Sequence, residues 1–125
     1  TAAYAQKKMY NEAIAVLKEA EKFVGNLPRV VAELGYAFAA SGQRLEAQKK
    51  LRELQARATQ EYIDPCFIAF IYIALGEKDQ AFKWLEKAYE EHSTQMVWLN
   101  LEPKYDPLRA DARFIALAKK VGLQN

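Results

Sequence analysis

The stretch that decides the fold is LGYAFAASGQRLEAQKKLREL, which spans Leu34 to Leu54. Its apolar residues recur at helical spacing on both sides of Ser41-Gly42, where a glycine interrupts the pattern. The stretch therefore predicts two helices joined by a tight turn. The apolar stripe of the first helix contains Leu34, Gly35 and Phe38, and that of the second contains Ala47, Leu51 and Leu54.

The same pattern recurs before and after this stretch. Ala13, Ala47 and Ala81 follow one another at intervals of 34 residues. A fixed period of this length is typical of a stack of helix-turn-helix repeats. We expect this alanine column to mark the point where two helices approach closely. Three further columns keep the period: the small residues Gly35 and Ala69, the aromatic residues Tyr4, Phe38 and Tyr72, and the aliphatic residues Leu17, Leu51 and Leu85.

Caps and breakers divide the rest of the chain into helices. Gly25-Asn26 and Gly122 are helix stops, and Asp64-Pro65 is a helix start. The segment from Ser93 to Leu101 is too apolar for a solvated loop, and Pro103 and Pro107 indicate a turn at residues 102–106. The expected helices are a short one within Thr1–Gln6, then Met9–Phe23, Pro28–Ser41, Arg44–Ala58 with Leu45 inward, Pro65–Leu75, Asp79–Glu91 and Ala112–Val121.

Composition excludes several classes of protein. The chain is 51% hydrophobic and 27% charged, which is ordinary for a globular domain, and its net charge of +2 does not indicate a nucleic-acid partner. One cysteine and one histidine provide neither an internal disulfide nor a zinc cluster. The longest apolar run, Cys66 to Leu75, is too short to span a membrane. We expect no cofactor, no metal, no nucleic acid and no membrane insertion.

Two residues have side chains that are candidates for chemistry. Cys66 lies just after a helix-starting proline, where a thiolate can be stabilised, and His92 lies near a helix end. Neither has a nucleophile, acid or base at a suitable spacing, so we interpret both as structural and the chain as non-enzymatic.

In these residues the chain resembles the tetratricopeptide repeat family. The best copy has Leu34, Gly35, Phe38, Gly42, Ala47, Leu51 and Leu54 at the matching positions, and a second copy has Ile68, Ala69, Tyr72, Gly76, Ala81, Leu85 and Ala88. Val31 and Pro65 stand where the family usually has tryptophan. The resemblance implies an all-α fold, a short right-handed α-solenoid of antiparallel helix pairs. We expect one such domain over residues 1–125, with a partial repeat at 1–27, repeats at 28–61 and 62–93, and a C-terminal capping segment at 94–125.

The ends of the chain carry two further expectations. Thr1 falls in the middle of a repeat, so we interpret the chain as part of a larger protein. Its last segment also resembles the C-terminal ends of bacterial multidomain signalling proteins that carry such repeats. The opening residues do not have the pattern of a signal peptide, and the cytoplasm is the favoured compartment.

The resemblance also implies a concave groove lined by the first helix of each pair. Family members that clamp a C-terminal carboxylate place Lys, Arg and Asn there, whereas this chain offers an anion only Arg29. The groove is instead expected to be apolar with aromatic walls, anchored by Tyr36, Phe67 and Phe70, and to bind an apolar or amphipathic peptide of a protein partner. Its expected lining is Arg29, Ala32, Glu33, Tyr36, Ala40, Ile63, Cys66, Phe67, Phe70 and Ile73.

Two alternatives stay open. One is homo-oligomerisation through apolar faces, and the other is a small apolar ligand held between Phe67, Phe70 and the C-terminal segment. We expect this segment to follow the Asp79–Glu91 helix and to stay off the groove. Trp98 is then buried against the last helix pair, while Phe67 and Phe70 remain partly open.

Overall fold

The computed structural model describes residues 2–122, with side chains from residue 5 onward. Every regular element in this range is a helix, which confirms the all-α prediction. The chain divides into two compact units, residues 1–63 and residues 64–125, and each is described by itself. Thr1 and the side chain of Tyr4, on which two expectations about the first repeat rest, lie outside the described residues.

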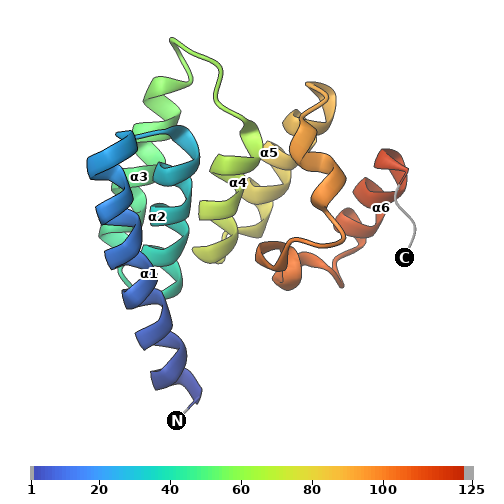
Figure 1. Cartoon of the computed structure of the whole chain (residues 1–125). Coiled ribbons are helices and arrows are strands. Elements are labelled where there is room, and N and C mark those ends of the chain that lie inside the picture. The colour runs from blue at the N-terminus through green and yellow to red at the C-terminus, as the bar shows by residue number, and fades with distance from the viewer. Residues whose placement is uncertain (1, 123–125) are drawn as a thin grey trace. The chain divides into compact units, whose positions relative to one another are not determined.

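The unit of residues 1–63 contains three helices, of which α2 packs against both α1 and α3 (Figure 1). The first is one continuous helix, so the expected separate short helix before Met9 is wrong. No glycine, proline or capping residue stands between Ala2 and Met9 to interrupt it. The helices are α1 (Ala2–Val24), α2 (Pro28–Ala40) and α3 (Arg44–Arg57).

In α2 and α3 the core follows the predicted stripes with one exception. Leu34, Ala47 and Leu54 are each at most 1% exposed, as the helical spacing requires. Leu45 was expected to point inward but is 75% exposed. It precedes Ala47 by two residues, which places it on the far side of α3 from the buried stripe.

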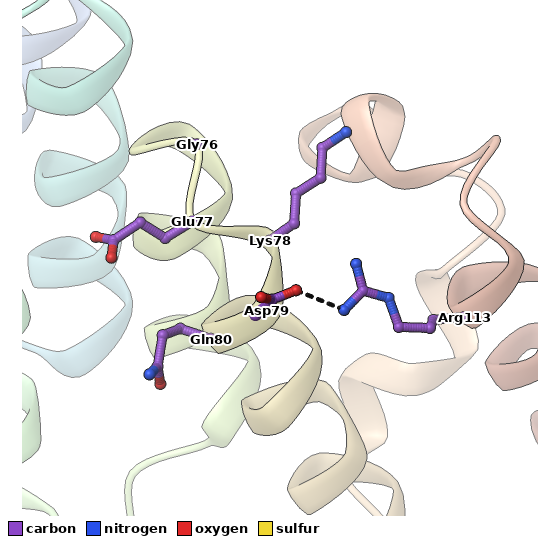
Figure 2. A pocket seen from close by; sticks show the side chains of 6 residues that line it. All are labelled: Gly76, Glu77, Lys78, Asp79, Gln80 and Arg113. Carbon is purple, nitrogen blue, oxygen red and sulfur yellow. Dashed lines mark hydrogen bonds and ion pairs between the residues drawn. The ribbon is translucent and has the colours of Figure 1, made fainter.

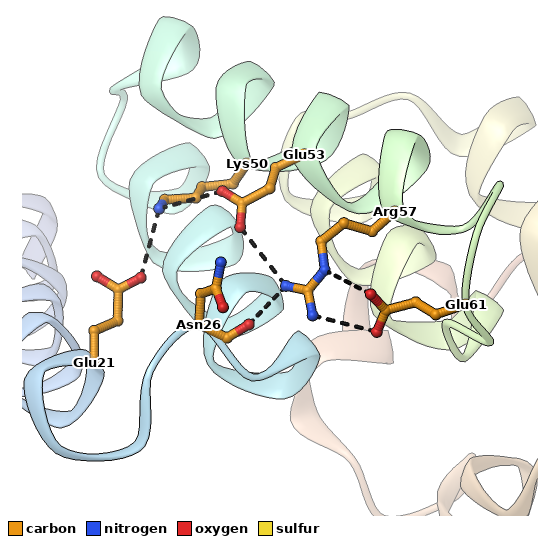
Figure 3. Close-up of polar contacts among 6 residues, drawn as sticks. All are labelled: Glu21, Asn26, Lys50, Glu53, Arg57 and Glu61. Atoms are coloured by element: carbon orange, nitrogen blue, oxygen red, sulfur yellow. Dashed lines mark hydrogen bonds and ion pairs between the residues drawn. The ribbon is translucent and has the colours of Figure 1, made fainter.

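Polar contacts fasten the loop between α1 and α2 to the end of α3 (Figure 3). The Arg57 guanidinium donates to the Asn26 carbonyl oxygen at 2.6 Å and also pairs with Glu61 at 3.3 Å. Nearer the start of α3, the Lys50 ammonium lies 3.7 Å from Glu21 of α1. These contacts join α1 and the loop that follows it to α3.

The unit of residues 64–125 contains a second helix pair and a C-terminal segment (Figure 1). α4 packs against α5 and also against the second of two 3₁₀ helices, while α6 packs against α5. The 3₁₀ helices occupy the stretch that was expected to be an apolar segment followed by a turn. The elements are α4 (Pro65–Ala74), α5 (Lys78–Glu90), η1 (Thr94–Trp98), η2 (Pro103–Leu108) and α6 (Ala112–Val121).

The turn that follows the first helix of each pair is the same in both units. Gly42 and Gly76 both have the left-handed backbone conformation, with φ of +88° and +80°. In each turn the next amide donates five residues back, from Gln43 to the Phe38 carbonyl and from Glu77 to the Tyr72 carbonyl. This closure favours glycine because a Cβ is disfavoured at positive φ. The 34-residue period therefore extends to the backbone of the turns.

The C-terminal segment contributes to the core of its unit. Leu99, Tyr105, Leu108 and Leu117 are all fully buried. They come from the segment between the 3₁₀ helices, from η2 and from α6, so the C-terminal segment completes the hydrophobic core of the α4–α5 pair.

Candidate functional site

The predicted groove residues of α2 form one stripe on that helix. Arg29, Glu33, Tyr36 and Ala40 are spaced by four, three and four residues, so they lie on one face. Arg29 is exposed and the other three are partly exposed. The Arg29 guanidinium lies 3.8 Å from the Glu33 carboxylate. Tyr10 of α1 meets the Tyr36 ring edge to face, with centroids 6.3 Å apart. We call these five residues the α2 face.

The other predicted groove residues are less accessible. Only Phe67 of α4 remains partly exposed, as expected. The side chains of Ala32, Ile63, Cys66, Phe70 and Ile73 are buried, each at most 6% exposed. Of the predicted lining, the structure therefore leaves accessible the stripe on α2 and the partly exposed ring of Phe67 on α4.

The C-terminal segment covers Phe70, so the expectation that Phe70 stays partly open is wrong. The Tyr105 ring of η2 lies 5.5 Å from the Phe70 ring, and the Lys104 ammonium lies 5.3 Å from its centroid. Tyr105 in turn contacts Phe114 of α6, with ring centroids 5.8 Å apart. Tyr105 thus takes the place that a small apolar ligand next to Phe70 would need.

Trp98 was expected to be buried, but it is 53% exposed. The reason is the 3₁₀ period of η1, in which residues three apart share one side. Met96 and Leu99 form the inner side and are 4% and 0% exposed. Trp98 lies on the outer side, and so does Leu101 in the turn that follows η1, which is 70% exposed. Apolar residues occur on both sides of this segment, so apolar character alone could not predict which of them would be buried.

A buried polar cluster joins the start of α4 to the C-terminal segment, and sequence reasoning did not find it. The Asp64 carboxylate caps α4 by accepting from the Cys66 amide at 2.9 Å, and it accepts from the Ser93 hydroxyl at 2.7 Å. Ser93 also caps η1 by accepting from the Gln95 amide at 3.1 Å. The one available signal was Asp64 before Pro65, which predicted the cap but not its second partner.

The Cys66 thiol of this cluster and the Tyr105 phenol beside it both stay protonated at neutral pH. Burial, together with the nearby Asp64 charge, raises the pKa of the Cys66 thiol to about 12. Burial beside Cys66 also raises the pKa of the Tyr105 phenol well above its usual range. The Tyr105 hydroxyl forms no hydrogen bond of good geometry with any described residue. A nucleophilic cysteine needs a low pKa and access to solvent, so Cys66 is unsuited to act as a nucleophile at neutral pH.

A polar hollow of about 540 Å³ lies at the turn between α4 and α5 (Figure 2). Arg113 of α6 is the residue that reaches it from outside the turn, and its guanidinium donates to Asp79 at 2.8 Å and to Asp111 at 3.0 Å. Hydrogen bonds from Arg113 lower the pKa of the Asp111 carboxyl to about 2. Two carboxylates already pair with this guanidinium, so Arg113 is not available to bind an anion in the hollow. Its lining is Gly76, Glu77, Lys78, Asp79, Gln80 and Arg113.

Within residues 2–122, no group of three or more His, Cys, Asp or Glu side chains is placed to hold a metal ion. No helix in the described part of the chain combines the length and apolar character needed to cross a membrane.

Comparisons with known proteins give no family assignment. The chain matches no family model, no curated protein and no solved structure at a significant level.

Proposed function

We propose that this chain is a protein-interaction module built from tetratricopeptide-like helix pairs, and that it binds an apolar or amphipathic peptide on the α2 face. The observation that carries the proposal is the stripe of Arg29, Glu33, Tyr36 and Ala40. It presents one aromatic ring and one ion pair on a regular helix.

The helix-pair architecture is supported by the repeated features of the two units. The same glycine turn follows α2 and α4, and the alanine column at Ala47 and Ala81 is fully buried in both pairs. We propose that these pairs are successive repeats of one solenoid. The absence of a family match does not count against this, because the resemblance rests on a few small and apolar positions.

The chemistry of the α2 face indicates which peptides it suits. Tyr36 supplies a rigid, amphipathic anchor, and its edge contact with Tyr10 fixes the ring. Burying one large apolar side chain contributes roughly 1.5–3 kcal/mol, whereas micromolar binding needs about 8 kcal/mol after association costs, so Tyr36 supplies one part of the affinity and further contacts of the peptide must supply the rest. Arg29 already pairs with Glu33, which disfavours a clamp for a free carboxylate.

A peptide-display selection against the full chain tests this function. Selected peptides are expected to carry apolar residues at helical or alternating spacing and to bind at micromolar affinity. Tyr36→Ser is expected to weaken their binding at least tenfold. Tyr62→Ser is the matched control, because Tyr62 is also in the unit of residues 1–63, is 65% exposed and lies outside the α2 face. Equal loss in both variants, or no selected peptide, counts against the proposal.

A further inference from the structure

A second apolar surface lies on α1, away from the α2 face. Met9, Val16 and Phe23 are spaced by seven residues, which places them along one side of the helix. They are 67%, 67% and 85% exposed. Ala13 and Ala20 lie between them and are only partly buried. These five residues form a continuous apolar strip, which we call the α1 strip; α1 is the blue helix in Figure 1.

α3 and α5, each the second helix of its pair, show how the surface that corresponds to this strip is normally covered. By the 34-residue period, Ala13, Leu17 and Ala20 of α1 correspond to Ala47, Leu51 and Leu54 of α3 and to Ala81, Leu85 and Ala88 of α5. All six residues of α3 and α5 are buried, whereas the three of α1 are only partly buried. α2 covers α3, and α4 covers α5. The described residues contain no corresponding helix over α1.

The covering helices share a feature that indicates the shape of a suitable partner. α2 has Gly35 and α4 has Ala69 at the column where each helix approaches its neighbour, and both residues are buried. On the α1 strip, Ala13 and Ala20 are similarly small, so another helix can approach the backbone closely there. A partner helix therefore needs a small residue at the crossing, with larger apolar side chains before and after it to contact Met9 and Phe23.

The charged residues beside the strip bear on whether a second copy of this chain or a different protein binds there. Glu12 and Glu19 are exposed on one edge of the strip. Lys8 lies on the same edge, which keeps a net negative charge, while the other lysines of α1 lie farther round the helix. The surface pair between Glu19 and Lys22, at 2.9 Å, is well solvated and weak. In an antiparallel pair of α1 helices the same edges meet, so Glu12 of one copy would face Glu19 of the other. Like charges placed together disfavour that dimer.

We infer that the α1 strip docks one amphipathic helix of a partner protein, with glycine or alanine at the crossing and lysine or arginine beside its apolar face. The two observations behind this are the uncovered strip, set against the covered faces of α3 and α5, and the acidic edge. The site is separate from the α2 face and does not depend on the peptide proposed to bind there.

A synthetic helix tests this site directly. The probe is a stapled amphipathic peptide of about 20 residues that carries Leu, Gly and Phe at the spacing of Leu34, Gly35 and Phe38, with lysines on both flanks of its apolar stripe. We expect the full chain to bind it, as measured by fluorescence anisotropy, and the Val16→Asp variant to lose at least tenfold in affinity. A second variant, Phe23→Ser, is expected to lose affinity as well. Both side chains are exposed, so circular dichroism is expected to show folded proteins.

Matched control variants distinguish binding at the α1 strip from binding elsewhere on the chain. Lys18→Asp changes the charge on the opposite side of α1 and is expected to leave binding within about twofold. The double variant Glu12→Gln, Glu19→Gln is expected to lower the affinity for the lysine-flanked probe at least threefold. The affinity for a probe flanked by glutamine instead of lysine should not change. Tyr36→Ser is expected to leave the affinity for the probe unchanged, because Tyr36 lies on the α2 face.

Three results would overturn the inference. One is a probe that does not bind, or that binds Val16→Asp as well as wild type. Another is binding that Tyr36→Ser abolishes while Val16→Asp does not, which places the probe on the α2 face and supports the proposed function instead. The third is a dimer in analytical ultracentrifugation that Val16→Asp dissociates, since the occupant is then a second copy of the chain.

Discussion

The α2–α3 pair and the α4–α5 pair have the same turn and the same buried alanine column, yet their first helices meet different surroundings. α2 has a buried stripe and, on another side, the partly exposed Tyr36 and Glu33. α4 is apolar nearly all round, and seven of its ten residues are buried. A helix of the second kind needs cover on every side. In residues 64–125 the chain supplies that cover itself, through Tyr105.

The comparison shows that an apolar helix surface is weak evidence for a binding groove. Phe70 was one of three anchors predicted from the sequence. It lies on the more apolar helix, and the chain's own η2 covers it. Tyr36 lies on a more mixed helix and stays accessible. The mixed surface is the better candidate for a site, because the unit has no internal need to bury it.

Tyr105→Ala is expected to have the largest effect. Removing a fully buried aromatic side chain typically costs about 3–5 kcal/mol, and here the cavity would open beside Phe70, Phe114 and Cys66. Chemical denaturation monitored by circular dichroism measures the loss. Tyr105→Phe is the control and should change stability by less than about 0.5 kcal/mol, because the hydroxyl has no well-formed hydrogen bond to lose. A similar loss in both variants would mean that the hydroxyl, not the ring, holds the segment.

Ala47→Leu and Ala81→Leu test what the two pairs share. Both alanines are fully buried where two helices approach, so a larger side chain forces the helices apart at a cost of about 1–3 kcal/mol. Thermal unfolding of both variants checks this. If either melting midpoint stayed unchanged, the repeat register would be wrong for that pair.

Asp64→Ala tests the hydrogen bonds that join the start of α4 to Ser93, which have no counterpart described in the α2–α3 pair. The carboxylate caps α4 and also accepts from the Ser93 hydroxyl, so its loss is expected to cost about 1–2 kcal/mol. Ser93→Ala removes the second contact and the η1 cap but leaves the α4 cap, so the two single changes and the double change form a cycle. Additive effects in that cycle would show that the two caps act independently.

His92→Gly is expected to have the smallest effect, and a stabilising one. His92 closes α5 at φ of 57°, where the earlier turns have Gly42 and Gly76. A non-glycine residue pays about 1–2 kcal/mol for this conformation, and the greater entropy of glycine in the unfolded chain offsets part of the gain. We expect a net gain of up to about 1 kcal/mol by denaturant unfolding, and Gly76→Ala should lower stability. Destabilisation by His92→Gly would show that the imidazole makes a contact that outweighs the strain.

The sequence was sufficient to predict the elements that depend on local pattern. The 34-residue period, the caps at Pro28 and Asp64 and the stops at Gly42 and Gly76 placed helix boundaries within one or two residues for most helices. The separate start of α1 was the exception, because nothing local interrupts that helix. Leu45 was misplaced because a leucine at a helix start was counted as core without its angular position.

The candidate site was harder to predict because it depends on contacts between distant residues. The partner of Phe70 is Tyr105, 35 residues further along the chain, in a segment whose prolines indicated only a turn. Trp98 and Leu99 are adjacent and both apolar, yet the 3₁₀ period buries one and exposes the other. Nothing in the local pattern distinguishes these outcomes.

The most direct test of the closure of η2 over α4 is the reactivity of Cys66, the chain's one cysteine, towards a thiol reagent under native conditions. If η2 covers α4, the buried thiol with its pKa of about 12 should react at least about 1,000-fold more slowly than a free thiol. In denaturant the same cysteine should react at the rate of a free thiol. Modification of the folded chain within tenfold of that rate would contradict the closure, because the surface of α4 beneath Tyr105 would then be open.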